Sequence, residues 1–537
     1  EKKGGQVSQP DLREIFNKRK DYLIHFKIKY EKTFGDHFLE SFVAVEQAEG
    51  EYRSITAYRK DFISPAIQEL FAGSGENMPA DGSRREWGRQ NIFGRINYNF
   101  KDKYLFETNL RYDGSYAFPK DKRWGFFPGV ALGWRMSEES FFQNITFLDN
   151  LKLRASYGEM GNDQINPFQY LSMYSLSPIG THFGGGTQAV LRTGVAPNEN
   201  ITWEVAKNSN LGFDAMFWDG ALGVTFDVFK QRRSNILTAR STEVPIYTGL
   251  VLPHENIGII ENKGLEFSLS HRNGTANKIH YSIAVNMGHA KNKIIDISEP
   301  QDMADYQKAE GSIIGAPLLY EAIGIFRTQE QVDASPVMPS TRVGDLQYRD
   351  INNDGTINSL DRTRQDKGSI PELTFGFNAT ISYKRFSLFA NFSGQSRAWT
   401  YFHKHARTTQ NSLRDLLLNR YVPGSMDSKY PILPQEDGAG EGEVSGMPST
   451  FWLQDASFLR LKTLQIDYTL PESALSKIGV SSMMIFVNGS NLFTLSDIKW
   501  YDPEGTPETA SHGGFSYSTG DFYPQTKIFN AGLNITF

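Results

Sequence analysis

The composition of this 537-residue chain excludes several classes of protein. The absence of cysteine excludes disulfides, thiol chemistry and thiolate metal sites. A formal net charge of −5 without a basic stripe gives nucleic-acid binding no electrostatic support. No apolar run approaches the roughly 18 residues of a membrane helix.

The start of the chain predicts one hairpin among weaker signals. Apolar and polar residues alternate in residues 22–30 and 38–46, on either side of Gly35-Asp36. The weaker segments are residues 1–20, expected as a loop or short helix, 61–71, expected as a short helix, and 73–85, expected as solvent-facing turns.

Residues 91–113 predict a longer hairpin with two distinct faces. Ile92, Ile96, Tyr98 and Phe100 fall on one face of the first arm, and the intervening polar residues fall on the other. Residues 101–103 form the turn, and the second arm repeats the pattern. This is the strand period, and an arm of about 10 residues can cross a hydrocarbon layer at a tilt.

The same alternating unit recurs to the last residue. Strands are expected at 129–136 and 150–157, in hairpins that turn at Asp219-Gly220, Asn273-Gly274 and Lys384-Arg385, and at 458–468, 483–492 and 529–537. The alternation changes phase near Thr463, which predicts a β-bulge. With about 15 strand candidates in all, the pattern predicts an all-β chain that forms an antiparallel transmembrane β-barrel.

Connector lengths predict the orientation of this barrel. Short turns alternate with long connectors at residues 159–201, 234–257, 292–371, 397–456 and 496–523. Outer-membrane barrels have short periplasmic turns and long extracellular loops, so the long connectors are expected to be extracellular. An odd number of strands leaves open edges, which lipid does not tolerate. We therefore expect additional N-terminal strands or a partner segment to close the barrel.

Several short motifs, in this order, resemble a known family. They are Ser156-Tyr157-Gly158 with Gly161-Asn162, Asn210-Leu211-Gly212-Phe213-Asp214, Asn262-Lys263-Gly264-Leu265-Glu266, Gly324-Ile325-Phe326, Gly344-Asp345-Leu346-Gln347-Tyr348-Arg349-Asp350, Phe458-Leu459-Arg460-Leu461-Lys462, Asn491-Leu492-Phe493-Thr494, Asp502-Pro503-Glu504 and the terminal Phe537. Together they resemble the C-terminal barrel portion of a SusC/RagA-type TonB-dependent transporter of Bacteroidetes. The resemblance assigns residues 1–537 to that portion, without the TonB box, plug domain and first strands.

The resemblance implies a plugged barrel of about 22 strands integral to the outer membrane and in contact with its lipid. It implies uptake of oligosaccharides or oligopeptides, powered by the TonB complex through the N-terminal part that this chain lacks. It also implies a SusD-like surface lipoprotein that closes over the barrel as a lid, in a dimer of such pairs. The sequence has no Ser-His-Asp arrangement with a local motif, no Walker loop and no zinc HExxH motif, so no enzymatic activity and no catalytic residues are expected.

One local motif has the spacing of a calcium loop. Oxygen-bearing side chains stand at positions 1, 3, 5 and 12 of residues 350–361, with glycine at position 6. The ligands expected on this spacing are Asp350, Asn352, Asp354, Thr356 through its backbone carbonyl, and Asp361. Position 12 is Asp rather than Glu, which shortens its reach. The alternatives are a structural Ca²⁺ that braces the long connector and an ion-free surface loop rich in Asx-turns.

Aromatic residues in two long connectors are candidate cargo contacts. Trp399 and Tyr401 follow one expected strand, and Trp500 and Tyr501 lie in the last long connector. Their faces could stack on sugar rings or peptide side chains. The alternative is that they pack the loops together or lie in the interfacial aromatic belt.

Two other classes of function compete with nutrient import. The first is a surface barrel without energised import that serves adhesion or assembly. The second is a secreted soluble enzyme acting on glycans, which would need carboxylates at catalytic separation. The continuous apolar stripe from Leu373 to Tyr383 argues against a soluble protein.

Overall fold

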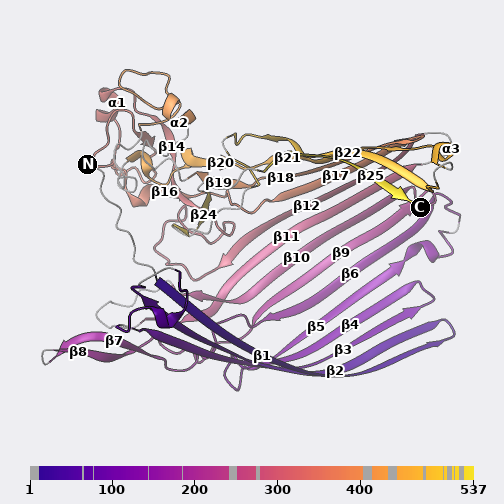
Figure 1. Ribbon diagram of the computed structural model, residues 1–537, viewed down its shortest axis with the longest axis horizontal. Coiled ribbons are helices and arrows are strands. Elements are labelled where there is room, and N and C mark those ends of the chain that lie inside the picture. Colours follow the sequence, from indigo (N-terminus) through magenta and orange to yellow (C-terminus); the bar gives the residue numbers. More distant parts are fainter. Residues whose placement is uncertain are drawn as a thin grey trace.

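The computed structural model is dominated by one 15-stranded sheet (Figure 1). It describes residues 11–537 except 63–65, 77, 143, 184–185, 241–250, 274–278, 403–413, 433–443, 476–478, 500, 505–510, 513–514 and 519–524. The strands of the sheet, in spatial order, are β1 (Asp11–Phe34), β2 (His37–Lys60), β3 (Ala80–Phe100), β4 (Tyr104–Ser115), β5 (Trp124–Arg135), β6 (Leu148–Asn162), β9 (Glu204–Phe217), β10 (Leu222–Ala239), β11 (His254–Asn273), β12 (His280–Asp296), β17 (Leu373–Tyr383), β18 (Phe386–Ser396), β21 (Phe458–Thr469), β22 (Ser482–Ser496) and β25 (Ile528–Thr536).

The remaining elements belong to the connectors. They are β7 (Tyr174–Phe183), β8 (Gly186–Thr193), β13 (Leu318–Tyr320), β14 (Ala322–Ile325), β15 (Leu346–Tyr348), β16 (Arg362–Arg364), β19 (Trp399–Phe402), β20 (Leu453–Asp455), β23 (Ser511–His512), β24 (Phe515–Ser518), α1 (Gln329–Asp333), α2 (Arg414–Asn419) and α3 (Glu472–Leu475). In Figure 1 the labelled connector elements gather at one end of the sheet, and α3 lies at the other end beside the short turns. The predicted segregation of long connectors to one end is confirmed.

The sheet is all antiparallel and its neighbours follow chain order, as the alternation predicts. The chain turns at Gly35-Asp36, at residues 101–103 and at Lys384-Arg385 as expected, whereas Gly274 of the turn after β11 lies outside the described residues. A register shift between Leu461 and Thr463 in β21 confirms the bulge.

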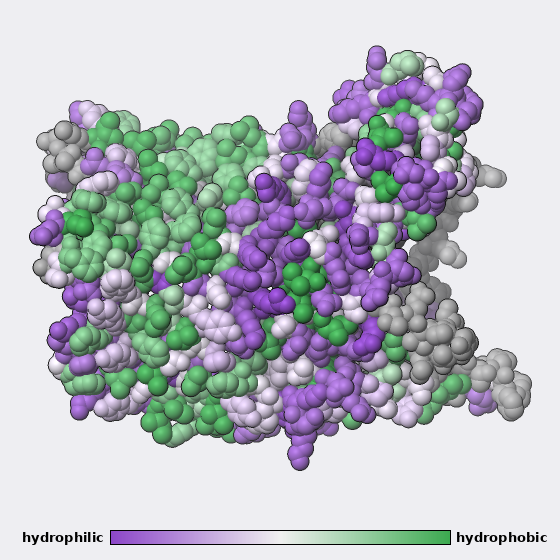
Figure 2. All heavy atoms as spheres, turned by 180° about the vertical axis from the view of Figure 1, so that it is seen from behind, coloured by the Kyte–Doolittle hydropathy of each residue, from purple (hydrophilic) through white to green (hydrophobic). Residues whose placement is uncertain are grey.

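The two faces of the sheet differ in polarity. On β3, Ile92 and Ile96 point outward and are more than 40% exposed, while Asn91 on the opposite face is buried and bonds Glu46 at 3.0 Å. Figure 2 shows hydrophobic residues over the half of one face nearer the short turns and hydrophilic residues toward the long connectors. We call the apolar face the outer face and the polar one the inner face.

Three expectations about the start of the chain are wrong in whole or in part. Residues 11–20 belong to β1, and the described residues of 61–71 contain no helix except the start of the 3₁₀ turn Leu70–Ala72. Residues 80–85 begin β3, whereas the described residues from 73 to 79 lie outside helices and strands, as expected. Residues 1–10 and 63–65 lie outside the described residues. The reason is that β1, β2 and β3 continue beyond the apolar band. Both faces meet water there, so the hydropathy alternation disappears while backbone pairing continues over the whole length of β1.

The edges of the sheet are open in the part of the chain that the structure describes. There β1 pairs with β2 alone and β25 with β22 alone, as expected for a barrel wall that needs further strands. In the same residues no helix combines the length and apolar character that crossing a membrane requires.

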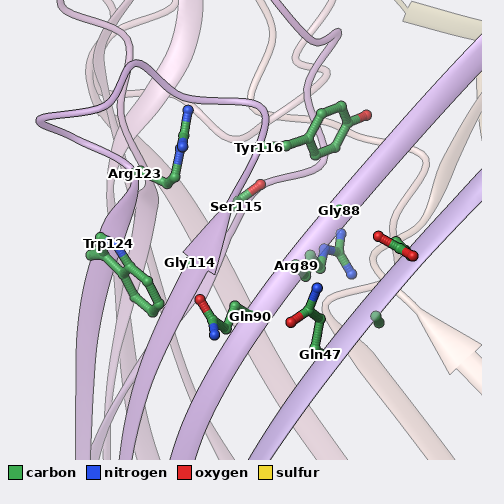
Figure 3. A pocket seen from close by; sticks show the side chains of 11 residues that line it. Gln47, Gly88, Arg89, Gln90, Gly114, Ser115, Tyr116, Arg123 and Trp124 are labelled. Carbon is green, nitrogen blue, oxygen red and sulfur yellow. The ribbon is translucent and has the colours of Figure 1, made fainter. Parts of the chain in front are cut away.

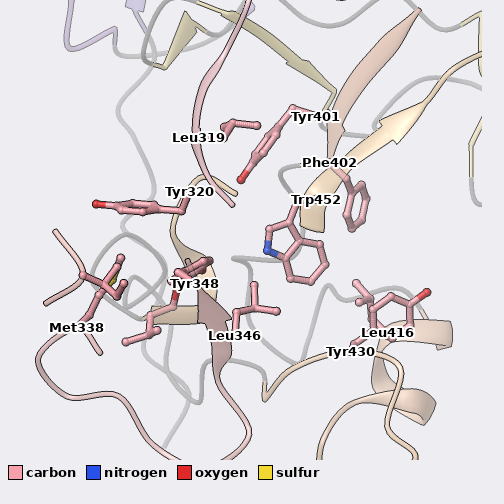
Figure 4. Close-up of a cluster of buried hydrophobic side chains, with 12 residues drawn as sticks. Leu319, Tyr320, Met338, Leu346, Tyr348, Tyr401, Phe402, Leu416, Tyr430 and Trp452 are labelled. Atoms are coloured by element: carbon pink, nitrogen blue, oxygen red, sulfur yellow. Dashed lines mark hydrogen bonds between the residues drawn. The ribbon is translucent and has the colours of Figure 1, made fainter. Parts of the chain in front are cut away.

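The connectors at the long-loop end build a hydrophobic core of their own, which we call the loop cap (described residues of 297–371 and 399–456). Its centre is a cluster of buried side chains that includes Leu319, Leu346, Phe402 and Trp452 (Figure 4). Within the cap the buried Ser445 hydroxyl donates to Asp345 at 2.7 Å. Such packing makes the cap a fixed element above the barrel wall.

Candidate functional site

The inner face carries a cavity of about 560 Å³ at the long-loop end of β1 to β3. Arg85, Trp87 and Arg89 reach it from alternate positions of β3, which places all three side chains on the face that also carries Asn91. Trp87 lies across Gly50 of β2, where an added Cβ would come within 2.2 Å of the indole nitrogen. Glycine at this position therefore gives the ring room to lie flat against the wall.

An ion pair joins the strands of this cavity to a connector. Arg89 donates two hydrogen bonds to Asp163, at 2.9 and 2.7 Å, in a bidentate pair. Asp163 is 10% exposed. Arg89 and Tyr116 also line a second cavity, of about 250 Å³ (Figure 3). With Tyr52 on the wall, the region combines aromatic faces with charged donors and acceptors, which are groups that bind sugar rings or peptides.

The inner wall below the cavity is polar and its charges are paired. Arg154 donates to Asp214 at 2.8 Å and to Asp227 at 2.9 Å, across β6, β9 and β10. Arg95 on β3 pairs with Glu107 on β4 at 2.7 Å. This pairing is what a polar barrel interior requires.

The predicted calcium loop is closed by its own hydrogen bonds. Both carboxylate oxygens of the fully buried Asp361 accept backbone N–H donors, from Ile351 and Asn358, at 2.8 Å each. Asp350 accepts from the Gly355 N–H at 2.9 Å. Donors from Asn352 and from the Thr356 backbone and hydroxyl hold the pKa of Asp354 at about 2.

These contacts match the Asx-turn alternative. They do not test whether the loop binds Ca²⁺, which stays a prediction. Gly355 adopts φ +83°, the left-handed conformation that the spacing expects of glycine. No group of three or more His, Cys, Asp or Glu in the described part of the chain is arranged to hold a metal ion. The ligand set of this loop includes Asn352 and a Thr356 carbonyl, so its chemistry still suits Ca²⁺.

The described aromatic residues that were predicted to contact cargo do not form one binding surface. Tyr401 is 4% exposed and lies in the loop-cap cluster, where its hydroxyl accepts the Ser449 N–H at 3.3 Å. Tyr501 stacks on Phe402 at 6.1 Å between ring centroids. Trp399 is partly buried under Lys367, whose nitrogen lies 4.1 Å from the ring centroid. Trp500 lies outside the described residues.

Sequence reasoning missed the residues of the cavity on the inner face. Tyr52, Trp87 and Asp163 are far apart in the chain, and no local motif joins them. Trp87 falls just after the segment that was expected to be turns, so the sequence did not predict that it lies on a strand. The one available signal was Arg85 and Trp87 at strand spacing.

The antiparallel sheet with one apolar and one polar face, and the loop cap at its long-connector end, are the features of an outer-membrane β-barrel wall. The family model described as "TonB dependent receptor-like, beta-barrel" matches residues 6–492, and the chain belongs to this family. It is accordingly an integral outer-membrane protein.

Comparison with known proteins agrees with this family. The chain is 29% identical to TonB-dependent receptor P3 of Formosa agariphila over 534 residues, which are 95% of this chain and 52% of that protein. It is 26% identical to TonB-dependent receptor SusC of Bacteroides thetaiotaomicron over 457 residues, 83% of this chain and 43% of that protein. A solved structure of the RagAB peptide transporter has the same fold, with a TM-score of 0.76 at 22% identity over 98% of this chain and 56% of that one. The chain thus spans about half the length of the curated relatives it matches.

Proposed function

We propose that this chain is the C-terminal barrel portion of a SusC-type nutrient importer that takes up oligosaccharides or oligopeptides by TonB-dependent transport. The observation that carries the proposal is the aromatic and charged cavity on the inner face, which opens onto a polar, ion-paired wall. A barrel with this lining gives a cargo both a first binding site and a hydrated path. The proposal assigns no enzymatic activity to the chain.

The proposal includes partners that the chain itself does not contain. A SusD-like surface lipoprotein would close over the long-loop end, where the connectors build the loop cap. The TonB complex would act on a plug domain elsewhere in a longer polypeptide. The open edges of the sheet and the half-length match to relatives support a longer polypeptide.

The experiment measures uptake by cells whose only copy of the full-length receptor carries Trp87→Ala. Cells receive fluorescent pools of size-fractionated oligosaccharides or oligopeptides. Loss of the indole should raise the half-saturating concentration of one pool about 3- to 10-fold, the value of one aromatic contact. The matched control is Trp218→Ala, which truncates an exposed tryptophan in a turn at the opposite end of the sheet. Equal uptake by both variants and the wild type would refute the role of the cavity.

The second candidate function is a surface barrel for adhesion or assembly, which the loop cap favours because its connectors pack around a hydrophobic core of their own. A protonophore separates the two candidates. Energised import stops when the proton gradient is dissipated, whereas adhesion does not. Intact mass of the polypeptide extracted from outer membranes is a further test, because a mass at 60.7 kDa would exclude autonomous TonB-driven import.

A further inference from the structure

The charges that line the cavity on the inner face are paired, with one exception. The lining carboxylates are Glu51, Glu86 and Asp163. Arg84 bonds the first two, at 3.2 and 2.5 Å, and Arg89 bonds the third. Of the lining arginines, Arg19 bonds Asp21 at 2.6 Å. Among the described residues, no carboxylate lies within salt-bridge distance of Arg85, which therefore keeps an unpaired positive charge beside the cavity.

The position of Arg85 is fixed by the register of three strands. Tyr52 on β2 is the pairing partner of both Arg19 on β1 and Arg85 on β3. Neighbouring strands are about 4.8 Å apart, so the backbones of the two arginines lie about 10 Å apart on either side of the tyrosine. Tyr52 donates its hydroxyl to Asn17 at 2.9 Å. Arg85 is exposed, so a cargo that enters the cavity can reach its guanidinium.

Trp87 supplies an aromatic surface next to this charge. It follows Arg85 by two residues of β3, so the two side chains share a face at a spacing of about 7 Å. The half-buried indole lies over Gly50, its pairing partner on β2, and also lines the cavity. A sugar ring that stacks on this indole therefore brings its substituents within reach of the long Arg85 side chain.

The connector after β6 contributes a further wall of the cavity. Asp163, Gln164 and Ile165 line it. Of these residues only Asp163 is charged, and its carboxylate is bound by Arg89. Phe168 of the same connector packs on Tyr116, another lining residue, with 5.8 Å between ring centroids. Its φ of +62° is rare for a bulky side chain, and strained residues of this kind cluster at binding sites. The connector thus adds aromatic surface without free negative charge.

We propose that the cavity binds an acidic oligosaccharide through a uronate residue, with the sugar ring on Trp87 and its carboxylate on Arg85. A guanidinium holds a carboxylate by two parallel, charge-assisted hydrogen bonds. A peptide also offers carboxylates, but only a uronate joins the carboxylate directly to a ring that stacks on the neighbouring indole. This inference rests on the proposed function and selects oligosaccharides over oligopeptides as its cargo.

The test measures binding to the full-length receptor, in detergent and with any lipoprotein that co-purifies, by equilibrium dialysis. The probes are labelled oligosaccharide pools from uronate polysaccharides, each paired with its carboxyl-reduced counterpart, and labelled oligopeptide pools of matched size. The wild type should bind the acidic pool about 10-fold more tightly than the reduced pool, which corresponds to about 1.4 kcal/mol. Arg85→Gln should remove this preference. Arg85→Lys should keep only part of it, because an ammonium group cannot form the two parallel hydrogen bonds.

The matched control is Arg53→Gln, which removes an exposed arginine of β2 on the face opposite to Tyr52 and should leave the preference unchanged. Heat-dependent electrophoretic mobility confirms that each variant is folded. Three results would overturn the inference: equal binding of the acidic and reduced pools by the wild type, an unchanged preference in Arg85→Gln, or an equal loss in Arg53→Gln. Tighter binding of oligopeptides than of the acidic pool would also overturn it, because the cargo would then be a peptide.

The Trp87→Ala variant separates failure of this inference from failure of the proposed function. If Trp87→Ala weakens binding of the acidic and reduced pools alike while Arg85→Gln changes neither, the cavity binds cargo without selecting charge. The inference then fails and the proposed function stands. If the wild type binds no pool at all, both fail together.

Discussion

Asp361 is compatible with both interpretations of residues 350–361, the calcium loop and the ion-free loop rich in Asx-turns. The spacing of residues 350–361 suits a calcium loop, yet both oxygens of this carboxylate already accept backbone N–H groups. A carboxylate oxygen has more than one lone pair, so a cation can share it with such a donor. The geometry therefore fixes the loop shape with or without an ion.

We expect Ca²⁺ to bind this loop with a dissociation constant of the order of 10⁻⁴ to 10⁻³ M, the range of extracellular calcium modules. Terbium luminescence and its displacement by Ca²⁺ measure this binding in the full-length receptor. Asp350→Asn combined with Asp354→Asn should abolish the signal, whereas Asp333→Asn in α1 should not. An unchanged signal in the double variant would contradict the prediction.

Asp354 gives the loop a pH dependence of known sign. Its hydrogen bonds, the one from Asn352 foremost, lower the pKa from 3.8 to about 2 in the folded protein. The ionised group therefore stabilises the loop above pH 4, and this stabilisation is lost as pH falls from about 4 to 2. Hydrogen exchange of the Gly355 and Thr356 amides should speed up over that interval, after correction for intrinsic rates. Asp354→Asn should show a flatter profile, and identical profiles would refute the assignment.

Arg460 joins β21 to the last long connector. Its side chain is 2% exposed and donates to Asp502 at 2.6 Å and to Glu504 at 2.7 Å. It also donates to Thr494 on β22 at 2.8 Å. One buried guanidinium thus holds the described residues 501–504 against the inner wall.

Arg460→Gln should release this connector. The change leaves Asp502, which is 11% exposed, without its cationic partner, at a cost of about 3–5 kcal/mol. Hydrogen–deuterium exchange should rise in residues 501–504 while the β1–β2 hairpin is unaffected. Lys462→Gln is the control, because Lys462 also contacts Glu504, at 2.6 Å, but is far more exposed. If both variants exchange alike, Arg460 does not hold the connector.

The elements also show how far sequence reasoning reaches. Alternation is strong where one face meets lipid, and there it predicts the fifteen strands, their order and even the phase change beside Thr463. Above the apolar band the alternation stops, which is why the first half of β1 was expected to be a loop or a short helix. The cavity around Trp87 is lined by residues from distant segments, and no local sequence pattern predicts that these residues lie close together.

The two faces of the sheet are expected to meet different surroundings, lipid on the outer face and water on the inner face. Phe377 and Asn378 are neighbours near the middle of β17, but Phe377 is paired with Val285 and Phe392 on the outer face. Asn378 lies on the inner face and is hydrogen-bonded to Asn391. The same substitution at these two positions therefore tests which face meets lipid.

Phe377→Arg should destabilise the folded barrel by about 2–4 kcal/mol, the cost of an arginine at the bilayer midplane. Asn378→Arg should cost much less, because the added guanidinium can be hydrated in the lumen or pair with carboxylates on the wall. Equilibrium unfolding of the full-length receptor in lipid vesicles measures both values, with heat-dependent electrophoretic mobility as the assay of folding. Equal destabilisation would mean that β17 does not face hydrocarbon. Greater destabilisation by Asn378→Arg would reverse the assignment of the faces, and with it the placement of the cargo cavity.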